Sequence, residues 1–313
     1  MHALITGGAG FIGSNLADRL LAAGHAVTVL DDLSLGRRDF LVAAATNPRF
    51  RFVEGDAREA ALLDAILGGQ LVDVAFHLAA NSDFARSHAA PVTDFDRTLG
   101  TSFALLDAMR RHQVRQIVFA SSSAIYGDAT GVLREDHGPL LPISHYGAAK
   151  LASEGFIAAF AENYGLQAWI ARFPNVVGQR LTHGAVHDFV ARLRQAPELL
   201  EVLGNGQQTK PYLHVDDLID AVLHGWAQLR ERVNLFNIAG TTRCSVARIA
   251  EIVVEESGRA AAIRFGSGDR GWIGDVPSVA LDTSRITATG WTPQRDSESA
   301  IRAAARWAWD QPA

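Results

Sequence analysis

Short apolar runs alternate with longer stretches of helical hydrophobic spacing through the first half of the chain. The apolar runs predict buried strands over residues 2–6, 26–31, 49–56, 72–80, 116–120 and 167–173. Between them, apolar residues recur every three or four positions, which predicts helices over residues 11–24, 58–67, 99–112 and 145–165. Apolar strands that alternate with helices are typical of a parallel sheet covered on both faces. The pattern therefore predicts an α/β fold with a doubly wound parallel sheet.

The regular alternation ends after residue 173. The pattern then predicts, in order, a loop (174–184), a helix (185–195), two short strands around a turn (within 199–215), a helix (216–230), a strand (233–240), a helix (246–257), a loop rich in glycine, aspartate and arginine, and a last helix. This order predicts a larger lobe and a smaller C-terminal α/β lobe. The larger lobe comprises residues 1–173 with returns at about 212–238, and the smaller one comprises 174–211 and 239–313.

Composition narrows the classes of function. The chain has 313 residues, of which 48% are hydrophobic and 20% charged, and a formal net charge of -5. Without a sustained basic block, such a chain is not expected to bind nucleic acid or an anionic membrane. Cys244 is the single cysteine, so no internal disulfide can form and a reducing compartment is favoured. The longest apolar runs are too short to span a bilayer, and we expect a soluble, cytoplasmic protein.

The segment TGGAGFIGSN places Gly7, Gly10 and Gly13 between the first expected strand and its helix. A nucleotide-binding turn needs residues without Cβ, because the backbone approaches a pyrophosphate and the helix packs closely on the strand. The amide groups at the helix start, those of Phe11 and Ile12 among them, then face the phosphates. A tight turn without a ligand is the plainer alternative, but the position between strand and helix favours a dinucleotide and a Rossmann-type sheet.

Two acidic residues end the next expected strands. Asp31 stands where a carboxylate can bind the hydroxyls of the adenosine ribose and repel a 2′-phosphate. NAD is therefore favoured over NADP, although Arg37 and Arg38 keep NADP open. Asp56 ends the following strand and could contact the adenine side of the cofactor or cap the next helix.

A tyrosine and a lysine in YGAAK share one face of the helix expected over 145–165. Tyr146 and Lys150 are four positions apart. A lysine ammonium close to a phenol lowers the phenol pKa from about 10 toward working pH, which makes the tyrosine a usable base. A hydroxyl from SSSAIYG (121–127), at the end of a neighbouring strand, would hold the substrate oxygen. These residues form a candidate catalytic site.

With these motifs in this order, the chain resembles the extended short-chain dehydrogenase/reductase family, the NAD-dependent sugar-nucleotide epimerases and dehydratases. The matching blocks cover nearly the whole chain: TGGAGFIGSN, LDDLS, GD (55–56), FHLAA, SSSAIYG, YGAAK, RFPNVVG, VLGNG and HVDDL. The resemblance implies that Ser122, Tyr146 and Lys150 are catalytic and that NAD is the cofactor. Tyr126 would then serve packing or line the site beside the nicotinamide.

The resemblance also assigns cofactor contacts to strand ends and to the catalytic pair. They are Gly7, Gly10, Phe11, Ile12, Gly13, Asp31, Asp32, Ser34, Asp56, Ala57, Leu78, Ala79, Ala80, Tyr146, Lys150 and Phe173. Two positions depart from the family pattern. Thr98 stands where relatives often have an asparagine near the cofactor, and Gln179 stands where a proline is usual. Thr98 leaves the local hydrogen bonding to the cofactor open.

Two positions in the serine-rich block separate reaction types within this family. The 4,6-dehydratases that the block resembles carry Asp and Glu where this chain has Ser123 and Ala124, and use them as acid and base to remove water. Decarboxylating relatives keep the glutamate. Ala124 can carry no proton, so elimination is disfavoured. Oxidation and re-reduction at one carbon remain, and the resemblance implies a UDP-hexose 4-epimerase acting on UDP-glucose and UDP-galactose.

Substrate-side residues are likewise implied by the resemblance. Asn175 and Arg270 would bind the diphosphate of a UDP-sugar, and Lys210 stands where relatives have an arginine for the nucleotide ribose and phosphate. Cations suit a diphosphate in a net-negative protein, whereas solvated surface charges are the alternative. Backbone contacts to uracil are expected from residues 200–206. The whole substrate set is Ser122, Ser123, Tyr146, Asn175, His187, Arg192, Val202, Leu203, Lys210, Tyr212 and Arg270.

One alternative concerns the sugar. His183, His187, Arg192 or Arg86 could receive a C6 carboxylate, which would make the substrate UDP-glucuronate. The histidines could be metal ligands, but no third ligand appears at suitable spacing, and we expect no metal. An Arg192→Ala variant that used UDP-glucuronate and UDP-glucose as the wild type does would remove Arg192 from this role.

Two further alternatives concern the type of protein. An NDP-4-keto-sugar reductase would release its cofactor in each cycle, and a non-catalytic regulator would only sense NAD. The intact serine, tyrosine and lysine argue against a regulator, which has no need of a base. The resemblance also implies a homodimer formed through the helices of residues 99–112 and 145–165.

Overall fold

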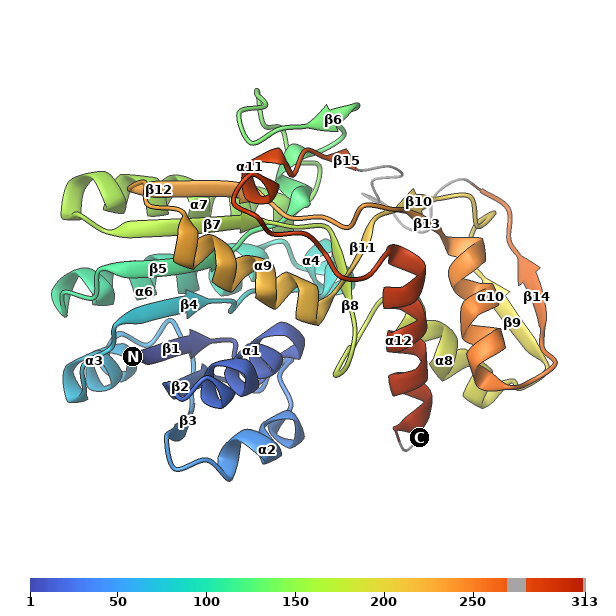
Figure 1. Cartoon of the computed structure of the whole chain (residues 1–313), viewed down its shortest axis with the longest axis horizontal. Coiled ribbons are helices and arrows are strands. Elements are labelled where there is room, and N and C mark those ends of the chain that lie inside the picture. The colour runs from blue at the N-terminus through green and yellow to red at the C-terminus, as the bar shows by residue number, and fades with distance from the viewer. Residues whose placement is uncertain (269–279, 312–313) are drawn as a thin grey trace. The chain divides into compact units, whose positions relative to one another are not determined.

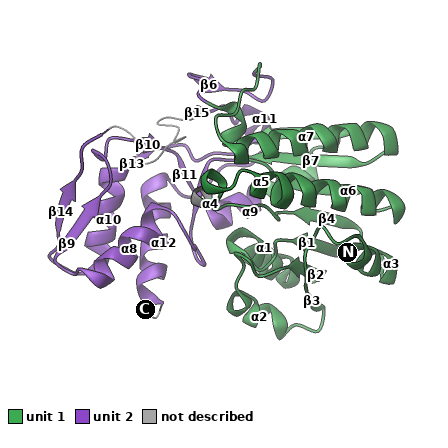
Figure 2. Ribbon diagram, turned by 180° about the vertical axis from the view of Figure 1, so that it is seen from behind, with its two compact units in different colours: residues 1–127, 138–172, 222–236 green, residues 128–137, 173–221, 237–313 purple. Residues whose placement is uncertain are grey.

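The computed structural model describes residues 1–268 and 280–311, and the chain divides into two compact units (Figure 2). The first unit comprises Met1–Gly127, Gly138–Arg172 and Val222–Phe236. The second comprises Asp128–His137, Phe173–Ala221 and Asn237–Ala313. The lobe boundaries expected from the sequence, 1–173 with returns at about 212–238 and then 174–211 and 239–313, remain a prediction.

A seven-stranded parallel sheet forms the centre of the first unit (Figure 1). Its strand order is β12-β7-β5-β4-β1-β2-β3, which confirms the doubly wound sheet predicted from the sequence. Ile5 of β1 lies between Val29 of β2 and Phe76 of β4, and all three side chains are buried. The strands are β1 (His2–Thr6), β2 (Ala26–Asp31), β3 (Phe50–Glu54), β4 (Val74–His77), β5 (Gln116–Ala120), β7 (Gln167–Arg172) and β12 (Val233–Asn237).

Helices cover both faces of this sheet. On one face lie α3 (Ala60–Gly69), α6 (Thr101–Arg111) and α7 (His145–Tyr164) (Figure 2). Their buried side chains, such as Leu63, Leu106 and Ile157, join the core with those of the strands. On the other face lie α1 (Phe11–Ala22) and the end of α9 (Val215–Gln228), whose Trp226 meets Phe76 edge to face at 5.8 Å. The remaining short elements of this unit are η1 (Arg38–Leu41), α2 (Val42–Ala45), α4 (Phe84–Ala89), α5 (Val92–Asp94), the π-helix η2 (Phe95–Gly100) and η3 (Ser123–Tyr126).

Several predicted strands end earlier than their apolar runs do. The run 72–80 predicts a strand to residue 80, but β4 ends at His77, and the amide of Leu78 makes the last bond to β1, to the carbonyl of Thr6 at 3.0 Å. Likewise, β3 ends at Glu54 rather than residue 56. Leu78, Ala79 and Ala80, which follow β4, are half-buried at the carboxyl edge of the sheet. An apolar run that extends past a strand therefore need not continue the strand.

The second unit departs most from the sequence-based expectation. The loop expected over 174–184 contains β8 (Asn175–Val177), which pairs in parallel with β11 (Tyr212–His214). The two strands expected within 199–215 are in fact three, and none pairs with another of the three. Their partners lie far away in the sequence, where local turn signals cannot reveal them. Besides β11 with β8, the pairs are β9 (Leu199–Val202) with β14 (Ala262–Phe265) and β10 (Thr209–Lys210) with β13 (Cys244–Ser245). A further pair of distant segments is β6 (Val132–Leu133) with β15 (Ala280–Leu281).

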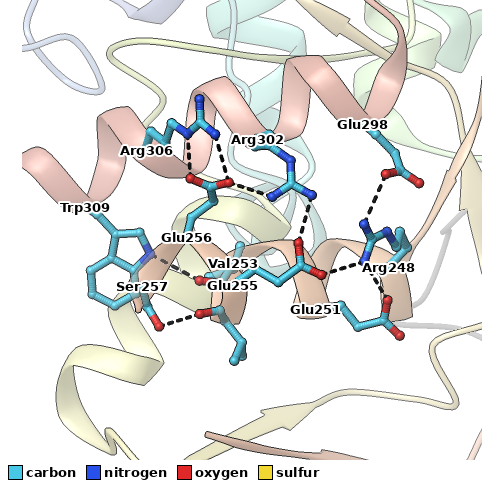
Figure 3. A network of polar contacts seen from close by, with 11 residues as sticks. Arg248, Glu251, Val253, Glu255, Glu256, Ser257, Glu298, Arg302, Arg306 and Trp309 are labelled. Carbon is cyan, nitrogen blue, oxygen red and sulfur yellow. Dashed lines mark hydrogen bonds and ion pairs between the residues drawn. The ribbon is translucent and has the colours of Figure 1, made fainter. Parts of the chain in front are cut away.

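Charged side chains join two helices of the second unit. Arg302 of α12 (Ser297–Asp310) lies between Glu255 and Glu256 of α10 (Val246–Ser257) (Figure 3). Its guanidinium nitrogens are 2.8 and 2.6 Å from their carboxylate oxygens. Arg248 of α10 binds Glu298 of α12 at 3.2 Å. The other helices of this unit are α8 (Ala185–Gln195) and α11 (Ser284–Thr287). None of the helices in the described part of the chain combines the length and apolar composition that a membrane span requires.

Candidate active site

The loops after β5, β4, β1, β2 and β3 lie along one edge of the sheet, because these strands are parallel neighbours. Open α/β sheets bind ligands at this carboxyl edge. The edge carries Gly7, Gly10, Phe11, Ile12 and Gly13 after β1; Asp31, Asp32 and Ser34 at the end of β2; Asp56 and Ala57 after β3; Leu78, Ala79 and Ala80 after β4; and Ser122 and Ser123 after β5. Phe173 directly follows β7 and belongs to the second unit.

The turn between β1 and α1 leaves no room for side chains at its glycines. Gly7 has a φ of +70°, and a Cβ there would lie 2.7 Å from the amide nitrogen of Ala79. A Cβ on Gly13 would lie 2.3 Å from the carbonyl oxygen of Gly7. No side chain caps α1, and its first turn carries no acidic residue. The positive end of the helix therefore stays available to an anion such as a pyrophosphate.

Asp31, at the end of β2, binds backbone amides of the loops after β1 and β2 at the carboxyl edge of the sheet. Its carboxylate is buried and accepts hydrogen bonds from the amides of Ala9 (2.9 Å) and Leu33 (2.8 Å). A Cβ on Gly36 would lie 2.6 Å from its Oδ1, so the loop passes close over the carboxylate. Burial raises the pKa of Asp31. Further hydroxyl donors, such as those of a ribose, would compensate this burial.

The two arginines that kept NADP open are paired within the protein. Arg37 donates to Asp39 at 2.6 Å, and its guanidinium lies 5.2 Å from the centre of the Phe40 ring. Arg38 binds Glu54. Both charges are therefore engaged by carboxylates, which weakens the case for a 2′-phosphate at this edge.

A cation at this edge was not foreseen from the sequence. Arg97, on η2, donates to the carboxylate of Asp32 at 2.8 Å and to the hydroxyl of Ser34 at 3.0 Å. Burial by itself would raise the pKa of Asp32, but the hydrogen bonds from Ser34 and Arg97 hold this pKa below its usual range. Arg97 thus ties the loop after β2 to η2, a link that joins residues 65 positions apart.

Asp56 does not cap the helix that follows it. Its carboxylate accepts from the backbone and guanidinium of Arg58, with the shortest contact at 2.6 Å, and these bonds lower its pKa. The N-cap of α3 is Glu59 instead, without a side-chain bond. The capping alternative is therefore wrong, and the adenine-side role stays a prediction.

Buried polar groups fix the end of β4. His77 is fully buried between the hydroxyls of Thr6 (2.7 Å) and Ser102 (2.8 Å), and burial lowers its pKa to about 3, so the ring is neutral. Thr98, which departs from the family pattern, accepts a hydrogen bond from the amide of Asn81 at 3.0 Å. The threonine hydroxyl therefore serves the backbone at this edge.

The catalytic candidates meet where η3 contacts the start of α7. Ser122 is the N-cap of η3, and its hydroxyl accepts from the amide of Ala124 at 3.1 Å. Ser144 caps α7 in the same way, through the amide of Gly147. A Cβ on Gly147 would lie 2.6 Å from the carbonyl oxygen of Ala124, so the two turns touch. This contact brings the phenol of Tyr146 into hydrogen bonding with the side chain of Ser122.

The electrostatics of Tyr146 differ from the expectation. Burial raises its pKa to about 12, the hydrogen bond with Ser122 opposes the rise, and the charge of Asp94 adds to it. Lys150 was expected to lower this pKa toward working pH. In the protein alone that expectation is wrong: the ammonium lies 5.7 Å from the centre of the Tyr146 ring, and the cost of burying a phenolate outweighs its effect.

Lys150 is itself strongly affected by its surroundings. The side chain is 2% exposed and donates to the carbonyl of Ala120 at 2.6 Å. Its nitrogen lies 4.6 Å from the centre of the Phe119 ring. Burial lowers the pKa of Lys150 to about 7, while Glu154 acts in the opposite direction. The lysine can therefore gain or lose a proton near neutral pH.

The second unit brings some substrate-side candidates together. Asn175 opens β8 and pairs in register with Tyr212 of β11. Lys210 lies on β10, opposite Cys244. At the end of β9, Val202 is buried, and Leu203 after it is exposed. Arg270 lies outside the described residues.

The candidates for a C6 carboxylate are spread more widely. His187 is half-buried on α8, with Asp188 3.4 Å from its ring. Arg192 donates to the carbonyl of Glu201 at 2.8 Å. His183 contacts the hydroxyl of Thr182. Arg86 is exposed on α4 of the first unit. Arg192 already has a partner within its own unit, which gives no support to the uronate alternative.

Three comparisons with known proteins bear on these observations. Residues 3–239 match the NAD dependent epimerase/dehydratase family. A UDP-glucose 4-epimerase of Azospirillum brasilense is 32% identical over 325 residues, which cover 97% of this chain and 91% of the relative. This chain belongs to the NAD dependent epimerase/dehydratase family.

Solved structures extend this family assignment. A UDP-glucose 4-epimerase of Thermotoga maritima with UDP-glucose matches with a TM-score of 0.88 and 29% identity, over 98% of each chain. A dTDP-glucose 4,6-dehydratase of Streptomyces venezuelae with NAD bound matches with a TM-score of 0.89 and 29% identity, over 98% of this chain and 96% of the other. Family and neighbours thus establish NAD as the cofactor, and the turn after β1 fits its pyrophosphate.

The residues of η3 include the two positions, Ser123 and Ala124, that are expected to separate reaction types within this family. Ser123 and Ala124 open the 3-10 turn beside Ser122. Tyr126 is buried, and its hydroxyl lies 2.9 Å from a guanidinium nitrogen of Arg172, which favours the packing role over one beside the nicotinamide.

Across residues 1–268 and 280–311, no cluster of three or more His, Cys, Asp or Glu could hold a metal ion.

Proposed function

We propose that this member of the family is a UDP-hexose 4-epimerase that interconverts UDP-glucose and UDP-galactose. One observation carries the proposal: Ser122, Tyr146 and Lys150 assemble at the carboxyl edge of the sheet, while the neighbouring position is Ala124. The arrangement offers one base for one hydroxyl and lacks the second acid–base pair that elimination of water requires.

Tyr146 would take the proton from the 4-hydroxyl of the sugar, with Ser122 hydrogen-bonded to the same oxygen. NAD⁺, when bound, supplies a positively charged nicotinamide that accepts the hydride from C4 and returns it. The same tyrosine would give the proton back after the 4-ketose has presented its other face. Breaking the C4–H and O–H bonds and re-forming them on the opposite face inverts C4 with no net oxidation.

Activation of Tyr146 needs positive charge. Because the pKa of Tyr146 is about 12 in the protein alone, its phenol is protonated at neutral pH. A protonated Lys150 and an oxidised nicotinamide would both stabilise the phenolate. The pKa of Lys150, about 7, makes its own protonation state part of this requirement.

Specificity would rest on UDP rather than on the sugar, because the ketose must turn over within the site. Asn175, Lys210, Tyr212 and Arg270 remain the predicted contacts to UDP, and His187, Arg192, Val202 and Leu203 remain further predicted substrate contacts. The register pairing of Asn175 with Tyr212 supports this proposal, since it places two of these residues side by side.

The direct test is incubation of the purified protein, with no added NAD, with UDP-glucose and separately with UDP-glucuronate, followed by NMR. We expect UDP-galactose to form from UDP-glucose without net NADH. The Tyr146→Phe variant should form UDP-galactose far more slowly than the wild type. Faster conversion of UDP-glucuronate would move the substrate to the uronate. Accumulation of NADH only after NAD⁺ is added would identify a dehydrogenase instead.

We further propose a homodimer formed through α6 and α7. Phe103 of α6 and Phe156 of α7 are 46% and 40% exposed, and their rings meet edge to face at 5.4 Å. Tyr164 continues this exposed row at the end of α7. Adjacent exposed aromatic rings on two neighbouring helices are typical of a surface that another chain covers.

A further inference from the structure

A buried ion pair lies directly behind the catalytic lysine. Glu154 follows Lys150 by one helical turn on α7, so the two side chains share a face. The Glu154 and Arg172 side chains are 7% and 3% exposed. The guanidinium of Arg172 donates to both carboxylate oxygens, at 3.0 and 2.6 Å. Such a two-point contact fixes the orientation of both groups.

Two more hydrogen bonds extend the pair to the catalytic elements. The hydroxyl of Ser121, at the end of β5, donates to Glu154 at 2.5 Å. Arg172 also donates to the hydroxyl of Tyr126 on η3 at 2.9 Å. The next residue after Ser121 is Ser122, and Lys150 itself binds the carbonyl of Ala120. The pair therefore joins α7, β5, β7 and η3 around the site.

The groups that face Lys150 come from every element packed around it. On α7 they are Tyr146 and Glu154; from β4, the neutral ring of His77 is affected by the lysine charge. β5 contributes an aromatic ring and a carbonyl. Asp94 of α5 acts on Tyr146, and Arg172 of β7 binds Glu154. Glu154 is the carboxylate whose charge acts on the buried ammonium.

The side chain of Glu154 is held in one position. Arg172 and Ser121 donate hydrogen bonds to its carboxylate oxygens, so its negative charge stays fixed near Lys150. The carboxylate of Glu154 thus binds the Arg172 guanidinium directly and acts on the buried Lys150 ammonium through its charge. A buried ion pair is weak evidence for stability, since its desolvation cost can exceed its attraction. A role in placing charge accounts better for this geometry.

We propose that Glu154, held by Arg172 and Ser121, is a positioning residue that keeps the Lys150 ammonium in place beside Tyr146 during catalysis. The proposal rests on the proposed function for its catalytic part, because it assumes that Tyr146 is the base. The placement of charge on Lys150 can be tested without any substrate.

The chain contains two lysines, Lys150 and Lys210, so selectively labelled lysine side chains give two NMR signals. The Lys210→Arg variant assigns them. We expect Glu154→Gln to lower the titration midpoint of Lys150 by about one pH unit or more, because an adjacent negative charge is removed. Glu154→Asp keeps the charge and should titrate nearer to the wild type. Arg172→Gln should raise the midpoint, because Glu154 then acts on Lys150 alone.

The matched control is Glu162→Gln on the same helix. Glu162 is exposed and pairs with Arg232 at the surface. Its replacement should leave the Lys150 midpoint unchanged. If either single variant fails to fold, the Glu154→Gln/Arg172→Gln double variant carries two neutral amides, which a buried site tolerates better than a lone charge. Its Lys150 should titrate below the wild type. Equal midpoints in the wild type and the folded variants would overturn the proposal.

Epimerase assays separate this proposal from the proposed function. In Glu154→Gln, the alkaline limb of the kcat profile should move to lower pH, with about tenfold lower kcat at the pH where the wild type begins to decline. A uniform loss at all pH values would indicate a merely structural role. If the NMR midpoints move as expected but the wild type converts no UDP-sugar, the proposed function fails and the control of Lys150 by Glu154 stands.

Discussion

Tyr146 is the residue whose loss tests the site most directly. Its phenol is hydrogen-bonded to Ser122, and Lys150 lies on the same helical face. We expect Tyr146→Phe to lower kcat by about 10²–10⁴, since general-base catalysis contributes about that factor. The affinity for UDP, measured by calorimetry, should change less than about threefold, because in the proposed mechanism the phenol would contact the sugar rather than the nucleotide.

Tyr164→Phe is the matched control for this variant. Tyr164 lies at the far end of α7 and is exposed, so its hydroxyl should not affect turnover. Near-normal turnover in Tyr146→Phe would remove this tyrosine from the role of base and turn attention to Ser122.

At the scale of residues, spacing in the sequence predicts neighbours better than it predicts energies. Tyr146 and Lys150 do share a face of α7. Their pKa values could not be predicted, because the sequence does not show how deeply Lys150 is buried. Arg97 and Glu154 were missed for a related reason: their partners Asp32 and Arg172 lie 65 and 18 positions away. Only the folded chain brings these charges together.

At the scale of elements, the turn from β1 into α1 gives a second prediction. Gly13→Ala places a Cβ 2.3 Å from the carbonyl oxygen of Gly7, and that oxygen belongs to backbone that cannot rotate away. We expect the free energy of unfolding to fall by about 1–3 kcal/mol, as for an overpacked core, despite the better helix propensity of alanine. The amount of NAD that copurifies should fall with it.

Gly69→Ala provides the comparison for this variant. Gly69 ends α3, and a Cβ there meets no atom within 4 Å. Its denaturation midpoint should stay the same or rise slightly. Unchanged stability and NAD content in Gly13→Ala would show that the turn between β1 and α1 can relax. Close packing of its glycines would then not be needed to bind a pyrophosphate.

The sheet of the first unit could be predicted because most of its strands are buried apolar runs that alternate with helices, β3 being the half-buried exception. Strands β1, β2 and β5 have the bounds that the apolar pattern gives. The short strands of the second unit could not be predicted. Asn175–Val177 pairs with a strand more than 30 residues later, and two- or three-residue strands leave no periodicity in the sequence.

At the scale of the whole molecule, the exposed rings of α6 and α7 predict the oligomeric state. If these rings pack against a second copy, Phe103→Ser with Phe156→Ser should convert a dimer to a monomer in sedimentation experiments, since interface aromatics carry much of the binding energy. Leu71→Ser is the control, because Leu71 is more exposed and belongs to neither of these helices. A wild-type monomer would leave the exposed rings without this explanation.

The path of the chain between its two units has a consequence for biosynthesis. The chain passes from one unit to the other five times, after residues 127, 137, 172, 221 and 236. Strand β12, which completes the edge of the sheet beside β7, leaves the ribosome only after a large part of the second unit has been made. Until then, β7 has a bare edge on which another nascent chain could add a strand. A gene truncated after residue 173 would make that exposure permanent, so aggregation rather than a free nucleotide-binding lobe is the expected product.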